Sequence, residues 1–278
     1  MNRNKNAEKM TGNGTTAISV SIQGMIDPLL GKIADRAIYT AQTLDGLIDG
    51  LEIGGFTKDF HKIEKALRQE PLRRILRSMP MNTLHIAAHP STVPSDEELE
   101  GIVAVANKSA QSGLCNAISF HLDMFPWFEV IEKAADPGLR LVFENLGGDA
   151  ERGNTVAEAK KAAERFPDWR FLLDTAHAME TKALRDEGPD DFARALDGRI
   201  EQIHFSWPGN LYPRELMGLD FSTRHSLSTM APEKTGALFE FLGRHPVPLV
   251  IIEGVVPEGE AGWELLRREI ETVRSVVS

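Results

Sequence analysis

Short apolar runs alternate with longer amphipathic stretches along most of the chain. The short runs are rich in β-branched and aromatic residues, which is typical of buried strands. They predict eight strands: Ala17–Ile22, Gly50–Ile53, Thr83–Ala87, Ala117–His121, Leu139–Glu144, Arg170–Asp174, Ile200–Phe205 and Pro248–Glu253. Helical patterns separate many of these strands, and this order of elements is typical of a parallel sheet.

The stretches between the runs carry apolar residues at helical spacing. Asp59–Met79, Thr155–Arg165 and Trp263–Val277 show this pattern. Another helix is expected to begin at Ser95, because its hydroxyl can cap the helix and Glu98 stands three residues later.

Eight strands alternating with helices, with no linker rich in Pro, Gly or Ser, predict one (β/α)8 TIM barrel over residues 16–278. A doubly wound open sheet is the alternative, but Gln23–Pro28 after the first strand lacks the glycine pattern of a dinucleotide site. The first ten residues are polar and lack the apolar core of a secretory signal. We therefore expect residues 1–15 to form a disordered leader.

Four predicted strands carry, at or next to their C-terminal end, a side chain that can bind a metal: Glu144, Asp174, His204 and Glu253. A carboxylate or imidazole at the end of a buried strand is costly unless a cation or a hydrogen-bond network compensates it. The C-terminal ends of barrel strands meet at one mouth, so we expect this quartet to bind one divalent cation. Oxygen ligands with one nitrogen suit Mn, Mg, Co or Zn. A helix N-cap is the alternative interpretation of Asp174.

Further histidines lie near the same strand ends. His121, with His85 or alternatively His89, could hold a second metal that shares Glu144 as a bridging ligand. A proton-relay or substrate-binding role is the alternative for each of these histidines.

A third metal could lie between His177 and His225, since His177 follows Asp174 by three residues. His177 is also a candidate catalytic residue. Only His61 and His245 fall in helical surface contexts.

Net charge and hydrophobicity limit which classes of partner the protein can bind. The net charge of −10 argues against non-specific nucleic-acid binding, and no run approaches the roughly 20 apolar residues of a membrane span.

A single cysteine, Cys115, excludes an intramolecular disulfide and fits a reducing cytoplasm. Cys115 precedes a strand, at the end opposite the barrel mouth, so we expect a structural thiol. Both a monomer and a homo-oligomer are compatible with the sequence.

The chain resembles the xylose-isomerase-like TIM barrels, the superfamily that also contains the endonuclease IV-type enzymes. The resemblance spans residues 17–278 and rests on these motifs: Glu144-Asn145, Asp174-Thr175-Ala176-His177, Ile203-His204, Arg224-His225 and Ile252-Glu253. It implies that the quartet holds a catalytic divalent metal. In the ketose epimerases the two matching glutamates also exchange a carbon-bound proton of the substrate.

In the endonuclease IV branch, residues similar to four histidines of this chain complete a three-zinc cluster that hydrolyses phosphodiesters: His85, His121, His177 and His225. Two positions differ from that branch. Thr223 stands where an acidic residue precedes the last histidine, and Phe205–Pro208 follows His204 where an Asn or Asp is expected.

These observations lead to three hypotheses. The first is a metal-dependent isomerase or epimerase of a small sugar or sugar phosphate, in which Glu144 and Glu253 act as base and acid around an enediolate. The second is an endonuclease IV-type phosphodiesterase (AP endonuclease family 2) with two or three ions of Zn or Fe, which leaves a nucleic-acid substrate open. The third is a metal-dependent barrel with another small-molecule or peptide substrate. From sequence we rank them in this order.

Overall fold

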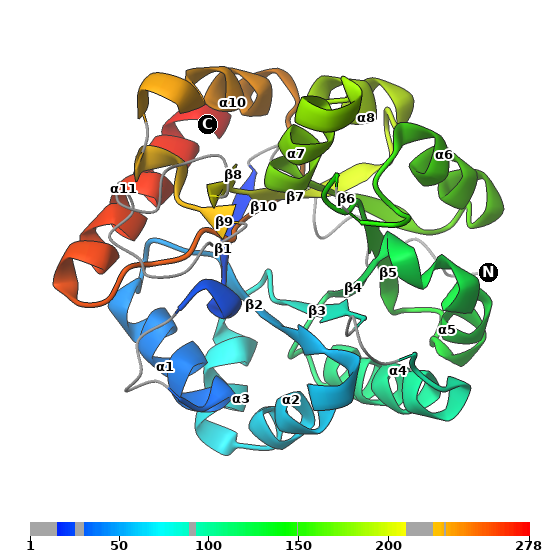
Figure 1. Ribbon diagram of the computed structural model, residues 1–278. Helices are drawn as coiled ribbons and strands as arrows, with labels where there is room; N and C mark the ends of the chain where they lie inside the picture. Colours follow the sequence, from blue (N-terminus) through cyan, green and yellow to red (C-terminus); the bar gives the residue numbers. More distant parts are fainter. Residues whose placement is uncertain (1–15, 26–30, 89–92, 149, 210–224, 231) are drawn as a thin grey trace.

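The computed structural model describes residues 16–25, 31–88, 93–148, 150–209, 225–230 and 232–278. Eight parallel strands close into a barrel in the order β1-β10-β7-β6-β5-β4-β3-β2, and helices surround it (Figure 1). The barrel strands are β1 (Ala17–Ser21), β2 (Gly50–Phe56), β3 (Thr83–Ala87), β4 (Ala117–His121), β5 (Arg140–Glu144), β6 (Arg170–Asp174), β7 (Ile200–Phe205) and β10 (Leu249–Ile252). The predicted TIM barrel is confirmed.

The helices lie outside the strands. They are α1 (Ile33–Thr43), α2 (Phe60–Leu67), α3 (Glu70–Ser78), α4 (Asp96–Gln111), α5 (Phe128–Ala134), α6 (Val156–Arg165), α7 (Thr175–Arg185), α8 (Pro189–Ala195), α10 (Pro232–Arg244) and α11 (Glu260–Val277). The short strands β8 (Trp207–Pro208) and β9 (His225–Ser226) pair as an antiparallel ribbon. Among the described residues, no helix is long and apolar enough to cross a bilayer.

One predicted helical stretch is divided in the structure. The helical pattern over Asp59–Met79 forms two helices, α2 and α3, with a break at Arg68 and Gln69. Pro71 lies in the first turn of α3. Proline has no backbone N–H and its ring clashes with the preceding turn, so a helix cannot run through this position without a kink.

The predicted cap of one helix is confirmed, and a second helix begins with a cap of the same kind. The Ser95 hydroxyl accepts a hydrogen bond from the backbone N–H of Glu98 at the start of α4. Thr155 and Glu158 form a complete capping box at the start of α6. Caps of this kind satisfy N–H groups that lack partners within the helix.

The barrel strands face two apolar environments. Alternate strand residues, such as Ile118 and Phe143, join the helices in the main core. A second, smaller cluster consists of strand residues and Met81, without any helical residue: Met81, Ala117, Val142, Leu172, Leu249 and Ile251. We infer that the second cluster fills the inside of the barrel, because side chains alternate between the two faces of a strand.

This inner cluster explains where the polar site begins. Residues two apart on a strand share a face. Glu144, Asp174 and Glu253 each stand two residues after a member of the inner cluster. The same alternation carries all three side chains into the barrel at its C-terminal mouth, above an apolar floor.

Candidate metal centre

The predicted quartet comes together around one imidazole. Nδ1 of His204 lies 3.0 Å from Oε2 of Glu253, 3.1 Å from Oε1 of Glu144 and 3.7 Å from Oδ2 of Asp174. All four residues are buried. Their ligand atoms lie within 4.8 Å of one another, close enough to surround a single ion.

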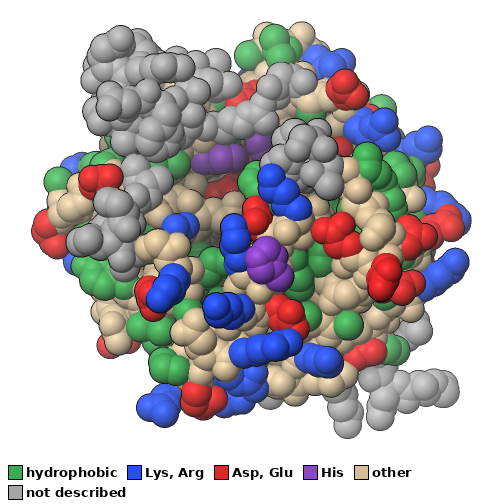
Figure 2. Space-filling model, turned by 60° about the horizontal axis from the view of Figure 1, so that its bottom comes forward, with side chains coloured by type: hydrophobic (Ala, Val, Ile, Leu, Met, Phe, Trp, Pro, Cys, Tyr) green, Lys and Arg blue, Asp and Glu red, His purple; other side chains and the backbone are tan. Residues whose placement is uncertain are grey.

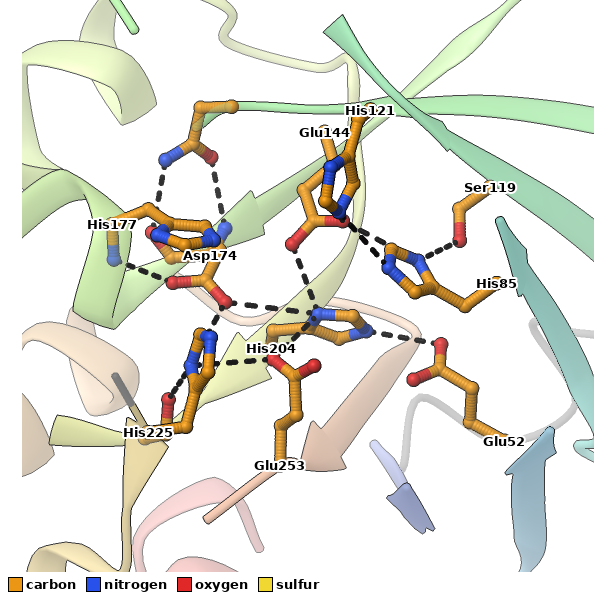
Figure 3. A network of polar contacts seen from close by, with 12 residues as sticks. Glu52, His85, Ser119, His121, Glu144, Asp174, His177, His204, His225 and Glu253 are labelled. Atoms are coloured by element: carbon orange, nitrogen blue, oxygen red, sulfur yellow. Dashed lines mark hydrogen bonds and ion pairs between the residues drawn. The ribbon is translucent and has the colours of Figure 1, made fainter. Parts of the chain in front are cut away.

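Two further groups adjoin the quartet (Figure 3). Nδ1 of His85 and Nε2 of His121 lie 3.4 and 3.7 Å from Oε2 of Glu144. On the other side, Nδ1 of His225 lies 3.6 Å from Oδ2 of Asp174, and His177 belongs to the same group. The structure therefore brings together every described site residue that the sequence predicted. His89 and Thr223 lie outside the described residues.

Asp174 serves two purposes. It is the N-cap of α7, and its Oδ1 accepts the backbone N–H of His177 at 2.6 Å. Its Oδ2 has no hydrogen-bond partner among the described residues and faces His204 and His225. The N-cap and ligand interpretations of Asp174 are thus compatible, because each uses a different oxygen.

Asn145 fixes the backbone that carries Asp174. The amide of Asn145 donates to the carbonyl of Asp174 at 3.1 Å and accepts from its N–H at 2.9 Å. This pair of hydrogen bonds ties the end of β5 to the end of β6. It holds two carboxylates of the quartet at a set separation.

The residues fit divalent metal ions. Glu144, Asp174 and Glu253 each keep one buried oxygen without a hydrogen-bond partner among the described residues. Those of Asp174 and Glu253 face His204 and His225, whereas that of Glu144 faces His85 and His121. Buried polar atoms almost always have partners, so these three oxygens indicate sites for cations. A carboxylate that faces two groups through different oxygens, as Glu144 does, is suited to bridge two ions.

Electrostatics differ among the histidines. Burial lowers the pKa of His121 to about 3, and it lowers that of His85 well below the usual range. Both are therefore neutral, which is the form that binds metal. Burial opposes protonation of His177 and His204 as well, but the surrounding carboxylates outweigh it: the pKa of His177 rises to about 9, and that of His204 is raised well above its usual range.

The carboxylates respond to the same charges. Burial raises the pKa of Glu144 and Glu253, against the pull of His204. The pKa of Asp174 is lowered, because His177 and His225 outweigh its burial. A metal that binds here would have to displace protons from His177 and His204, so we expect metal affinity to increase with pH.

Sequence reasoning missed one buried carboxylate of the site. Glu52 on β2 is fully buried, and its Oε2 lies 3.0 Å from Nε2 of His204. Leu51 and Ile53 flank it. A single acidic residue between apolar residues of a strand was the available signal, since alternation turns it toward the barrel interior.

The mouth opens onto one face of the molecule. In Figure 2, histidine and acidic side chains lie at the bottom of a hollow on this face. The side chains of His121 and His225 are the most exposed of the site histidines, at 18% and 19%.

Comparisons with known proteins agree with this architecture. No protein-family model matches the chain, and no curated protein matches it in sequence. A crystal structure of endonuclease IV from Thermus thermophilus is similar at a TM-score of 0.58 and 18% identity, over 92% of this chain and 98% of that one.

A second similar structure is the probable 3-DHS dehydratase AsbF, involved in petrobactin synthesis, from Bacillus anthracis. It has a TM-score of 0.61 and 12% identity, over 92% of this chain and 98% of that one. A dihydropteroate synthase from Xanthomonas albilineans is similar at a TM-score of 0.51 and 14% identity, over 94% of each chain. The closed parallel barrel and these similarities show that the chain has a TIM-barrel fold, which it shares with these enzymes.

Proposed function

We propose that the protein is a metal-dependent hydrolase of phosphodiesters that uses more than one divalent ion. One observation carries the proposal: the carboxylates of the quartet are shared with both histidine groups. Glu144 presents Oε1 to His204 and Oε2 to His85 and His121. Asp174 Oδ2 faces both His204 and His225.

Each residue then has a defined role. Glu144, Asp174, His204 and Glu253 would hold a central ion. His85 and His121 would hold a second with Glu144, and His177 and His225 a third with Asp174. Bound divalent ions supply Lewis acidity at the phosphoryl group and lower the pKa of the attacking water. The apolar floor excludes bulk water from beneath the site, which strengthens the electrostatic interactions within it.

The proposal changes the order of the hypotheses drawn from sequence. A one-metal isomerase does not need His85, His121, His177 and His225 around its metal. Similarity to an endonuclease IV supports the hydrolytic function. In this proposal Glu144 and Glu253 are metal ligands, and His177 is a ligand rather than a separate catalytic group.

The isomerase or epimerase is the second candidate. It is favoured by Thr223, because an acidic ligand is missing at that position, and by the completeness of the quartet on its own. Glu144 and Glu253 would then exchange a proton on a small sugar or sugar phosphate. The similarity to a dehydratase shows that non-hydrolytic enzymes have this fold.

Metal analysis and two activity assays separate the candidates. We expect protein purified without added metal to hold two or three equivalents of Zn or Fe and to cleave bis(p-nitrophenyl) phosphate or an abasic DNA strand. His121→Ala should lose about one equivalent and this cleavage, because a two-metal clamp acts on both the attacking and the leaving oxygen. His61→Ala, an exposed histidine on α2, is the matched control and should change neither.

The opposite result is equally well defined. One equivalent of Mn or Co, unchanged in His121→Ala, together with incorporation of solvent deuterium into a ketose, would replace the hydrolase with the isomerase.

A further inference from the structure

The imidazole of His204 is held from both sides. Its Nδ1 faces the carboxylates of the quartet at 3.0–3.1 Å, and its Nε2 faces Oε2 of Glu52 at 3.0 Å (Figure 3). Both His204 and Glu52 are 0% exposed, so water does not compete for either nitrogen. A histidine that binds a metal through Nδ1 carries its proton on Nε2, where it needs an acceptor.

Glu52 is placed to accept the hydrogen bond from Nε2 of His204. It lies within β2, between a parallel neighbour on each side, opposite Ser21 of β1 and Thr83 of β3. The hydroxyl of Thr83 donates to Oε2 of Glu52 at 3.3 Å. The carboxylate is therefore fixed by the barrel wall and not by a loop.

We propose that Glu52 is a positioning residue for the metal centre. It accepts the Nε2 proton of His204, which fixes the tautomer with the Nδ1 lone pair directed at the quartet. It also sets the rotation of the ring and raises the basicity of Nδ1 as a ligand. This proposal rests on the metal centre of the proposed function, but it holds for either the hydrolase or the isomerase.

A direct ligand role is the competing interpretation. Ligand atoms of Glu52, His85 and His204 lie within 4.8 Å of one another and could surround an ion of their own. Such an ion would need the Nε2 lone pair of His204. That nitrogen would then carry no proton, and both ring nitrogens would have to be ligands at once. The geometry favours a hydrogen bond at Nε2.

Two variants distinguish these roles. Glu52→Gln keeps a hydrogen-bond acceptor but removes the charge, whereas Glu52→Met keeps most of the volume and removes the acceptor. We expect the affinity for Zn²⁺, measured by competition with a chelator, to fall about 10–100-fold in Glu52→Met and less than about tenfold in Glu52→Gln. Gln202→Met is the matched control: it is fully buried two residues before His204 on β7, and its metal affinity should not change.

A nuclear magnetic resonance measurement reports the tautomer itself. In the zinc-loaded protein, the Nε2–H of His204 should give a slowly exchanging signal, assigned by its loss in His204→Gln. In Glu52→Gln the signal should persist but shift, because a neutral acceptor replaces a charged one. This measurement stands even if Glu52→Met does not fold.

The outcomes that overturn the proposal are distinct. Wild-type affinity in both Glu52 variants, or an unchanged Nε2–H signal in Glu52→Gln, would show that Glu52 does not position His204. Loss of a whole zinc equivalent in both variants would make Glu52 a ligand. A wild-type protein that binds no zinc would instead overturn the proposed function.

Discussion

Asn145 offers a quantitative test of how the site is supported. Asn145→Ala removes both hydrogen bonds to the backbone of Asp174, at 2.9 and 3.1 Å, inside a fully buried region. A buried backbone group left without its partner costs about 1–3 kcal/mol. For two such bonds we expect the free energy of unfolding of the metal-free protein to fall by about 2–4 kcal/mol. The value lies below twice the upper limit because small shifts of the backbone let each group regain part of its hydrogen bonding.

The chain contains a matched control for this change. Asn107 on α4 makes the same pair of bonds away from the site: its amide donates to the carbonyl of Ala134 and accepts from the N–H of Asp136, both at 2.9 Å. Asn107→Ala should also lower the free energy of unfolding, but by less, because its two bonds are only partly buried. Only Asn145→Ala should also weaken metal binding, by about tenfold or more, because it releases a ligand-bearing backbone.

Urea denaturation of the metal-free proteins gives the first quantity, and chelator competition gives the second. A decrease in the free energy of unfolding of less than about 1 kcal/mol in Asn145→Ala would refute the estimated contribution of the two hydrogen bonds. Equal metal affinities in the two variants would refute the supporting role of Asn145.

Single features of the chain lead to four more expected outcomes. Glu253→Gln should keep the fold, seen by circular dichroism, while metal content and activity fall together; retained activity would make Glu253 structural. Burial raises the pKa of Asp123 to about 6, against 3.8 in the unfolded chain, so wild-type stability decreases as pH rises through this range. Asp123→Asn should therefore be more stable than wild type by about 1–3 kcal/mol in urea at pH 7 but not at pH 3. Burial raises the pKa of Cys115 to about 12, so a thiol reagent should label it only after unfolding, and rapid labelling of native protein would contradict this. Deletion of residues 1–15 should leave the melting temperature nearly unchanged, whereas a fall of many degrees would mean that the segment docks.

Most of the barrel could be predicted from sequence because each strand is a short apolar run between helical patterns. β3, β4, β6 and β7 have the predicted bounds. β2 extends to Phe56, three residues beyond the predicted end at Ile53. In the structure Gly54 and Gly55 pair with His85 and Ile86 in β3.

The residues of the candidate site could be predicted where a metal-binding side chain lies at the end of a predicted strand. Glu144 and Asp174 end their strands, His204 lies one residue before the end of β7, and Glu253 directly follows β10. The topology of the barrel brings such ends together. Glu52 lies in the middle of its strand, so this rule does not reach it. The sequence predicted that Glu144 bridges two metals. Which histidines each of its oxygens faces depends on the side-chain rotamer, and only the structure gives that rotamer.

Closure of the barrel determines when, during synthesis and folding, the residues of the candidate site come together. β1 pairs with β10, so the first and last strands of the barrel meet only when nearly the whole chain is present. His85 and His121 are synthesised long before Glu253, which follows β10. Contacts between such distant parts of a chain form slowly and late. The four residues of the quartet therefore come together only after β10 has been synthesised, and a chain that ends before Glu253 cannot complete the quartet.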